Sequence, residues 1–198
     1  MKYSLKDINR FKISSVITFL IGIVALIAGA LFALGIIENA NGLAFLVLGG
    51  CIFLIAAIMF FSDLYGYNKM KKKIASFDEK EILDQLNSHL LHAHTNSKSG
   101  RISCFFTEKY VISVGSDIIP VDDIDWTYVQ IQNSTPYYVI RLLNNREFRP
   151  GVLAYKDAVK PCDSALLKAN PKILVGATKE NSDKHKERVK EYRSGKKD

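Results

Sequence analysis

Hydrophobic positions concentrate in the first third of the chain, in two long runs. Residues 13–37 contain no charged side chain, and residues 43–62 again contain none. Each run reaches the roughly 20 residues that an α-helix needs to cross about 30 Å of hydrocarbon. The pattern therefore predicts two transmembrane helices, 13–37 and 43–62, joined by a short loop at 38–42. A buried core helix is the alternative for either run, and the presence of two such adjacent runs argues against it.

A secretory signal peptide is the alternative for the first run alone. Basic residues precede it, and Ala28-Gly29-Ala30 resembles a cleavage site between small residues. The apolar run continues past this point for longer than the hydrophobic region of a signal peptide. This favours a retained helix.

The basic residues beside the two runs predict their orientation. Lys2, Lys6, Arg10 and Lys12 precede the first run, none lies in the connector, and Lys69, Lys71, Lys72 and Lys73 follow the second. Cytoplasmic flanks retain Lys and Arg during insertion. We therefore expect a multi-pass protein of the cell membrane with both termini cytoplasmic and the 38–42 loop outside. The four lysines after the second run are expected to contact the membrane surface, where each attracts anionic lipid headgroups by about 1 kcal/mol.

Small residues in both runs predict close helix packing. Ala25, Gly29 and Ala33 recur at four-residue intervals in the first run, and Gly49 and Gly50 lie in the second. Small side chains let helix backbones approach closely, so a tight antiparallel hairpin is expected, with homo-oligomer formation as the alternative. Neither run contains an ionisable residue of the kind that transport pathways keep, which argues against a transporter.

The pattern changes after the second run. Residues 63–77 read as a basic juxtamembrane linker. Ser76 and Glu79 have the spacing of a capping box, and apolar residues recur behind them at helical intervals, which predicts an amphipathic helix over 78–94.

From residue 102 onward, short runs rich in β-branched and aromatic residues predict strands. They are ISCFFT, YVISV, DIIPV, DWTYVQIQ and YYVIRLL, separated by short turns. Short turns favour an antiparallel meander, because parallel strands need long crossovers. Helices are expected at 155–169 and 179–193, with a short apolar run at 173–176 between them. The predicted fold class is a membrane α-helical hairpin plus an α+β soluble domain over 102–198, an antiparallel sheet with flanking helices.

Several of these segments resemble the bacterial pleckstrin-homology-like (PH-like) domains of uncharacterised two-helix membrane proteins. The matching segments are FTEKYVIS at 106–113, IIPVDDI at 118–124, YVIRLLNNREF at 138–148 and ANPKILVGATKE at 169–180. The resemblance implies a curved antiparallel sheet, although five or six strands are predicted where a complete domain has seven. Eukaryotic relatives bind phosphoinositides through basic residues on the first hairpin, and the nearest equivalents here are Lys98 and Arg101.

A histidine cluster is the most notable candidate for chemistry. His89 and His92 lie three residues apart on the predicted helix, His94 follows, and Cys104 could add a further metal ligand. Structural zinc normally takes four well-spaced ligands, and histidines at a helix C-terminus also complement its dipole without metal. The sequence therefore predicts no metal centre.

The remaining motifs argue against several kinds of site and assign no function. Asp122, Asp123 and Asp125 lack the glycine and distal glutamate of a calcium loop, so they read as a solvated strand entrance. Nucleophile-elbow, zinc-protease, P-loop and dinucleotide motifs are missing, so neither an enzyme nor a cofactor is predicted. Three cysteines without paired spacing fit a reducing cytoplasm.

The net charge of +7 does not indicate nucleic-acid binding. Eight of the positive charges flank the apolar runs, and Glu187 and Glu191 interleave with the basic residues of the last helix.

The leading hypothesis is a membrane-anchored, non-enzymatic binding or scaffolding protein whose sheet domain engages a protein partner or anionic headgroups of the inner leaflet. The alternatives are a membrane-bound metal-dependent hydrolase that uses the histidines and an accessory subunit of a larger membrane complex.

Overall fold

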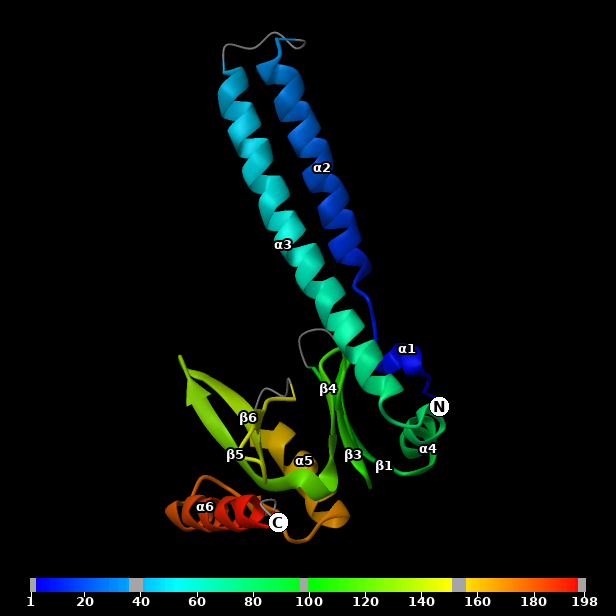
Figure 1. Ribbon diagram of the computed structural model, residues 1–198, viewed down its shortest axis with the longest axis vertical. Coiled ribbons are helices and arrows are strands. Elements are labelled where there is room, and N and C mark those ends of the chain that lie inside the picture. Colours follow the sequence, from blue (N-terminus) through cyan, green and yellow to red (C-terminus); the bar gives the residue numbers. More distant parts are fainter. Residues whose placement is uncertain (1–2, 36–40, 97–99, 151–155, 196–198) are drawn as a thin grey trace. The chain divides into compact units, whose positions relative to one another are not determined.

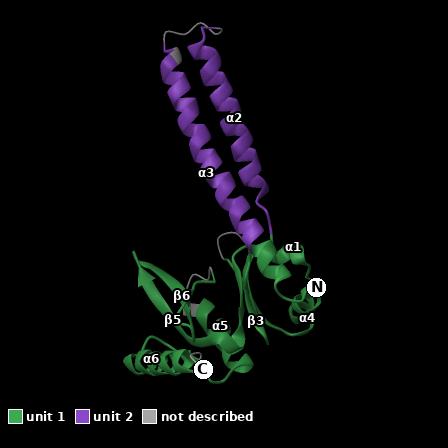
Figure 2. Cartoon of the chain, viewed as in Figure 1, with its two compact units in different colours: residues 1–9, 70–198 green, residues 10–69 purple. Residues whose placement is uncertain are grey.

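The computed structural model divides the chain into two compact units, coloured separately in Figure 2. The described residues are 3–35, 41–96, 100–150 and 156–195. We name residues 10–69 the hairpin unit, and residues 1–9 together with 70–198 the sheet unit. Figure 1 labels their helices and strands.

Two long helices form the hairpin unit. Helix α2 spans Ile13–Ala33, and helix α3 spans Gly42–Ala75, with its last turns in the sheet unit. Both are long and apolar enough to cross a membrane, and only 11% of the most apolar window of each is buried. A helix that is apolar all round needs an apolar environment, and here the protein does not supply it. The prediction of two such helices is confirmed.

Helix α3 runs further than the sequence predicted. The linker expected at 63–77 is helical up to Ala75, because its lysines, leucine and methionine all favour helix and no proline interrupts it. Asp63, expected in the linker, lies in α3. Its carboxylate accepts hydrogen bonds from Lys12 Nζ at 2.8 Å and from the Ser15 hydroxyl, both at the start of α2. Residues 36–40, in the predicted first span and loop, lie outside the described residues.

Glycines lie where α2 and α3 approach most closely. A Cβ atom on Gly49 would lie 2.4 Å from the Ala25 carbonyl oxygen, and one on Gly29 would lie 2.6 Å from that of Phe45. Both distances are far below van der Waals contact. Of the other small residues named from the sequence, Ala33 is exposed, and a Cβ on Gly50 would meet nothing within 4 Å.

The first sheet of the sheet unit is an antiparallel meander of four strands. These are β1 Leu90–Thr95, β2 Ile102–Thr107, β3 Tyr110–Ser113 and β4 Asp117–Pro120, in that spatial order. One face carries Phe105, Ile112 and Ile118, and α1 Leu5–Ile8, the end of α3 and α4 Glu79–Ser88 pack against it. All four residues of β3 are buried, so both faces of this sheet are covered.

The amphipathic helix predicted over 78–94 is wrong beyond Ser88. Helix α4 begins after Asp78, whose carboxylate accepts from the Lys80 backbone N–H at 2.9 Å, and residues 90–95 form β1. The apolar spacing that suggested a helix also fits alternation along a strand. Pairing with β2 decides between them, because it satisfies the backbone of 90–95.

The second sheet breaks the predicted single meander. A 3₁₀ turn, η1 Val121–Asp123, separates β4 from β5 Ile124–Gln132, which pairs with β6 Thr135–Leu142. Strand β7 Glu147–Phe148 flanks β6, and β8 Leu174–Val175 pairs in parallel with β5. The described strands thus number eight in two sheets, where the sequence predicted five or six. Strand β1 lies in the segment predicted as a helix, and the two-residue strands β7 and β8 are too short for periodicity to show.

Helix α5 Lys156–Ala169 completes an inner core between the two sheets, and α6 Lys179–Ser194 contacts β5 and β8. Buried in this inner core are Cys104, Phe106, Val111 and Ile119 from the first sheet, Tyr138, Ile140 and Leu142 from the second, and Cys162, Ala165 and Leu166 from α5. The α+β soluble domain with an antiparallel sheet is confirmed at this level.

Two neighbouring glycines test the packing of the hairpin unit. Gly49→Ala should force α2 and α3 apart at a cost of about 1–3 kcal/mol, because the new methyl group meets the Ala25 carbonyl. Gly50→Ala should be neutral or slightly stabilising, since its methyl group enters open space and Ala favours helix. Spin labels on the two helices of the detergent-solubilised protein would measure the separation. Equal distances in the two variants would contradict the packing.

Candidate functional site

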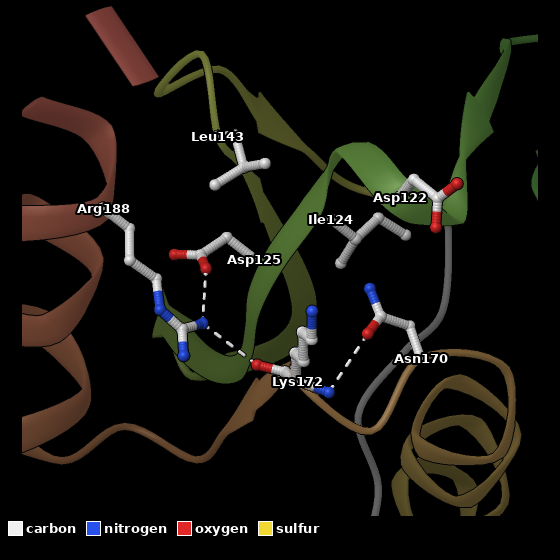
Figure 3. A pocket seen from close by; sticks show the side chains of 7 residues that line it. All are labelled: Asp122, Ile124, Asp125, Leu143, Asn170, Lys172 and Arg188. Atoms are coloured by element: carbon white, nitrogen blue, oxygen red, sulfur yellow. Dashed lines mark hydrogen bonds and ion pairs between the residues drawn. The ribbon is translucent and has the colours of Figure 1, made fainter. Parts of the chain in front are cut away.

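A cleft of about 420 Å³ lies where β5, α6 and the end of α5 meet (Figure 3). Its lining combines carboxylates, an amide, two basic side chains and two aliphatic ones. These residues are Asp122, Ile124, Asp125, Leu143, Asn170, Lys172 and Arg188. Among these described lining residues none is a serine, threonine, cysteine or histidine, so they offer charge and hydrogen bonds.

One wall of the cleft is a buried ionic network around Asp125. Its side chain is 2% exposed and contacts His185 Nδ1 at 2.6 Å. Arg188 donates from Nη1 to the other Asp125 oxygen at 2.7 Å and to the Lys172 carbonyl at 3.0 Å (Figure 3). The Nε2 atom of His185 is buried and has no partner among the described residues.

The sequence does not indicate this network. The acidic run predicts that Asp125 is solvated together with Asp122 and Asp123; for Asp125 this is wrong, although the other two are exposed. The reason is tertiary, because His185 and Arg188 come from α6, about 60 residues away, at the three-residue spacing that puts both on one helix face.

The structure separates the histidines that the sequence grouped. His89 follows α4, and its ring nitrogens contact Glu108 at 2.9 Å and Asp84 at 3.5 Å. His92 and His94 alternate along β1 and therefore point to the same side of the sheet. A three-histidine site for the hydrolase alternative is therefore not assembled.

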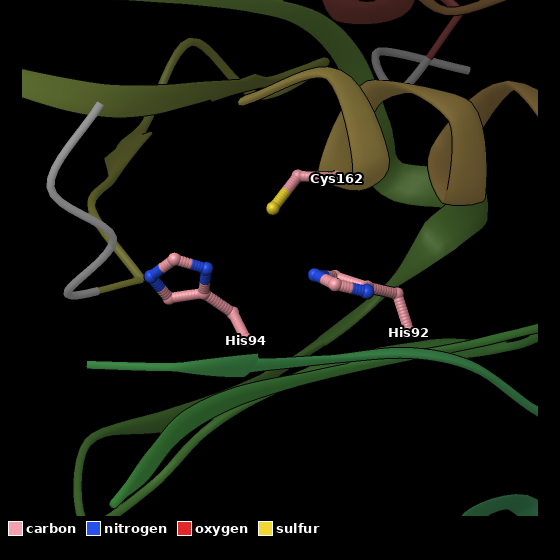
Figure 4. Close-up of side chains that lie close together, drawn as sticks. All are labelled: His92, His94 and Cys162. Atoms are coloured by element: carbon pink, nitrogen blue, oxygen red, sulfur yellow. The ribbon is translucent and has the colours of Figure 1, made fainter. Parts of the chain in front are cut away.

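A cysteine far from the histidines in the sequence lies beside the other two of them. Cys162, on α5, points towards the gap between His92 and His94 (Figure 4). The ligand atoms of the three residues all lie within 4.8 Å of one another. Cys104, the thiol proposed from sequence, pairs with His94 in the ladder but is not part of this group. We name His92, His94 and Cys162 the His-His-Cys cluster.

The surroundings of the His-His-Cys cluster keep it uncharged. Burial lowers the pKa of His92, and burial together with the nearby His92 lowers the pKa of His94. Burial, aided by the Asp163 carboxylate, raises the pKa of the Cys162 thiol to about 12. Both imidazoles are therefore neutral near pH 7, and the thiol holds its proton.

A half-buried carboxylate, Asp163, fixes α5 to the second sheet. The Asp163 carboxylate accepts from the Tyr138 hydroxyl at 2.5 Å and from the Thr127 hydroxyl at 3.1 Å. Burial raises the pKa of Asp163, and burial with the neighbouring carboxylate raises that of Tyr138. The two hydroxyl donors satisfy an acceptor that would otherwise be costly to bury.

The basic residues named from sequence divide into two groups. Lys69, Lys71 and Lys72 are exposed. Lys73 is half-buried, with its ammonium 3.4 Å from Asp117 and 5.7 Å from the centre of the Phe77 ring. Of the pair suggested by the PH-like resemblance, Arg101 is exposed and Lys98 lies outside the described residues.

Comparison with protein-family models, with curated proteins and with solved structures finds no match for this chain.

The ionic network predicts that Asp125 contributes more to the free energy of unfolding than Asp183 does. Asp125→Asn should lower the free energy of unfolding by about 2 kcal/mol, because it weakens the pairing of two basic groups, one of them buried. Asp183→Asn, which breaks an exposed ion pair of α6 with Lys186, should cost at most about 0.5 kcal/mol. Trp126 is the only tryptophan of the sequence and its ring lies 5.6 Å from that of His185, so its fluorescence during urea unfolding reports on this region. Equal losses in both variants would contradict a special role for Asp125.

Proposed function

We propose that this protein is a membrane-anchored, non-enzymatic binding protein whose sheet unit holds an extended segment of a partner protein. In this proposal α2 and α3 cross the cell membrane, both termini are cytoplasmic, and the exposed lysines after the second span contact the membrane surface. The observation that carries the binding role is the open edge of β5.

The order of elements supports a PH-like fold. Strands β1 to β4 form one antiparallel sheet, β5 to β7 form the antiparallel part of a second, and α5 follows. This makes seven antiparallel strands before a helix, the strand number that the resemblance implies. Strand β8 and helix α6 are additions to that arrangement.

The open edge arises because the strand beside β5 is short. Strand β5 has nine residues, and β8 pairs with only Trp126 and Thr127. Across the described ranges, no strand pairs with that side of β5 from Tyr128 to Gln132. An unpaired edge of this kind is a template for strand addition.

The strand pairing of β5 shows to which side each of its backbone N–H and C=O groups points. The Thr127 carbonyl accepts from the Gly176 N–H at 2.9 Å, so Thr127 faces the β8 side. Alternation then places the N–H and C=O groups of Val129 and Ile131 on the same side. The register agrees, because Ile131 pairs with Pro136 of β6, which has no N–H to give.

The two edges of the β5–β6 hairpin differ in a way that favours β5. On β6 the outer edge carries Pro136, which cannot donate to an added strand. On β5 no proline intervenes, and the Ile131 side chain is 74% exposed beside that edge. A partner segment with an apolar residue opposite Ile131 would pair with this edge and cover the side chain.

A proline at the edge tests the binding role. Ile131→Pro removes the outward N–H, and with it one hydrogen bond of about 1 kcal/mol, so partner capture should fall at least about fivefold. A photo-crosslinker at Gln132 of the full-length protein in membranes measures that capture. Ile131→Thr, which keeps the N–H and the branched side chain, serves as the control and should retain most of the crosslinking.

Two outcomes contradict the edge as a binding site. One is crosslinking in Ile131→Pro equal to that of the parent, with the Trp126 fluorescence unchanged. The other is the absence of any crosslinked species in the parent.

The membrane topology has its own test. A membrane-impermeant thiol reagent applied to intact cells should modify Asn41→Cys, in the predicted 38–42 loop, and should modify Ser194→Cys, near the end of α6, only after permeabilisation. The physical reason is retention of Lys and Arg on the cytoplasmic side. Labelling of Ser194→Cys in intact cells would reverse the assigned orientation.

A further inference from the structure

We propose that His92, His94 and Cys162 form a binding site for a zinc-class transition-metal ion, with a solvent molecule in the fourth position. The donor set carries the identity of the ion, because two imidazoles and one thiolate suit borderline and soft cations and not magnesium or calcium. This inference is independent of the partner-binding role proposed for β5.

The geometry requires only small movements. A tetrahedral zinc ion with Zn–N of about 2.0 Å and Zn–S of about 2.3 Å separates its ligand atoms by roughly 3.3–3.7 Å. The three atoms here lie within 4.8 Å of one another, and the rings are inclined at 54°, with their centres 6.3 Å apart. A closure of about 1 Å between the ligand atoms, within the reach of side-chain rotation, brings them to tetrahedral spacing.

His92 and His94 differ from the other two histidines of the chain in their side-chain partners. His89 and His185 each contact a carboxylate. His92 and His94 make no side-chain hydrogen bond or ion pair within the described part of the chain. Their ring nitrogens therefore remain available to a metal ion.

Metal binding at this site is coupled to proton release. Neutral imidazoles present a lone pair without first losing a proton. The Cys162 thiol must release its proton to solvent as the Zn–S bond forms, so each ion bound releases one proton at neutral pH. The negative charge of the Asp163 carboxylate disfavours a Cys162 thiolate when no metal ion is bound. The same charge attracts a nearby divalent cation.

The site also has rigid support and access. His92 and His94 lie in the β1–β2 ladder, opposite Phe106 and Cys104, while Cys162 is held by α5, which Asp163 ties to Tyr138. His92 is only half-buried, which leaves a path for an ion from solvent. A bound ion would link β1 of the first sheet directly to α5.

Cobalt substitution tests the site in the full-length protein. After treatment with a chelator, added Co²⁺ should give one equivalent of a tetrahedral spectrum with a thiolate-to-cobalt charge-transfer band, which Zn²⁺ should abolish by displacement. Cys162→Ser should remove that band, and His94→Gln should weaken Zn²⁺ binding at least about 100-fold. The matched controls Cys51→Ser and His89→Gln, which change an exposed cysteine and the carboxylate-paired histidine, should leave both unchanged.

Two results would overturn the proposal. One is a parent protein that binds Co²⁺ only in the weak octahedral form, and the other is a charge-transfer band that survives in Cys162→Ser. If a variant unfolds by its Trp126 fluorescence, X-ray absorption of the Zn²⁺-loaded parent decides instead. One sulfur at about 2.3 Å with two nitrogens at about 2.0 Å supports the site, and a shell without sulfur refutes it.

Discussion

The packing of α5 against both sheets is the interaction on which the rest of the sheet unit depends. Each sheet has an apolar inner face that water would otherwise reach, and Cys162, Ala165 and Leu166 of α5 are buried between them. Apolar burial alone would let the helix slide or rotate, because it has no direction. Asp163 supplies the direction, since its two hydroxyl donors come from adjacent strands of the second sheet. The helix is thereby held at one rotation, and that rotation aims Cys162 at β1.

How much the sequence could predict follows from the range of the interactions concerned. The starts of the two apolar helices and the strands β2 to β6 follow from local sequence patterns, and they were predicted close to their observed positions. The end of α4 was predicted wrongly, because Leu90 fits both a helix face and a strand face. Only the pairing with β2 decides between them. Likewise, α3 continues after hydropathy falls, because loss of hydrophobicity does not end a helix.

The candidate sites were harder to predict than the fold, since each joins segments far apart in the chain. Asp125 is buried by His185 and Arg188 from α6, and nothing near Asp125 in sequence indicates this. The spacing of His185 and Arg188 on one helix face was a usable signal, but without knowing what they face it reads as a solvated surface. Cys162 lies nearly 70 residues from His94, so a search for clustered ligands chose Cys104 instead, which is adjacent in the ladder yet outside the group.

The two sheets differ in how much of their surface remains for binding. The first sheet is covered on both faces, by helices on one side and by the inner core on the other, so it serves as a scaffold. In the second sheet the flanking strands β7 and β8 each cover two residues of a much longer hairpin. The unpaired part of β5 is an aggregation hazard unless something occupies it, because its backbone groups are already directed outward. Ionic and hydroxyl networks fix the elements around this edge, so the strand-binding role proposed above requires no rearrangement of β5 itself.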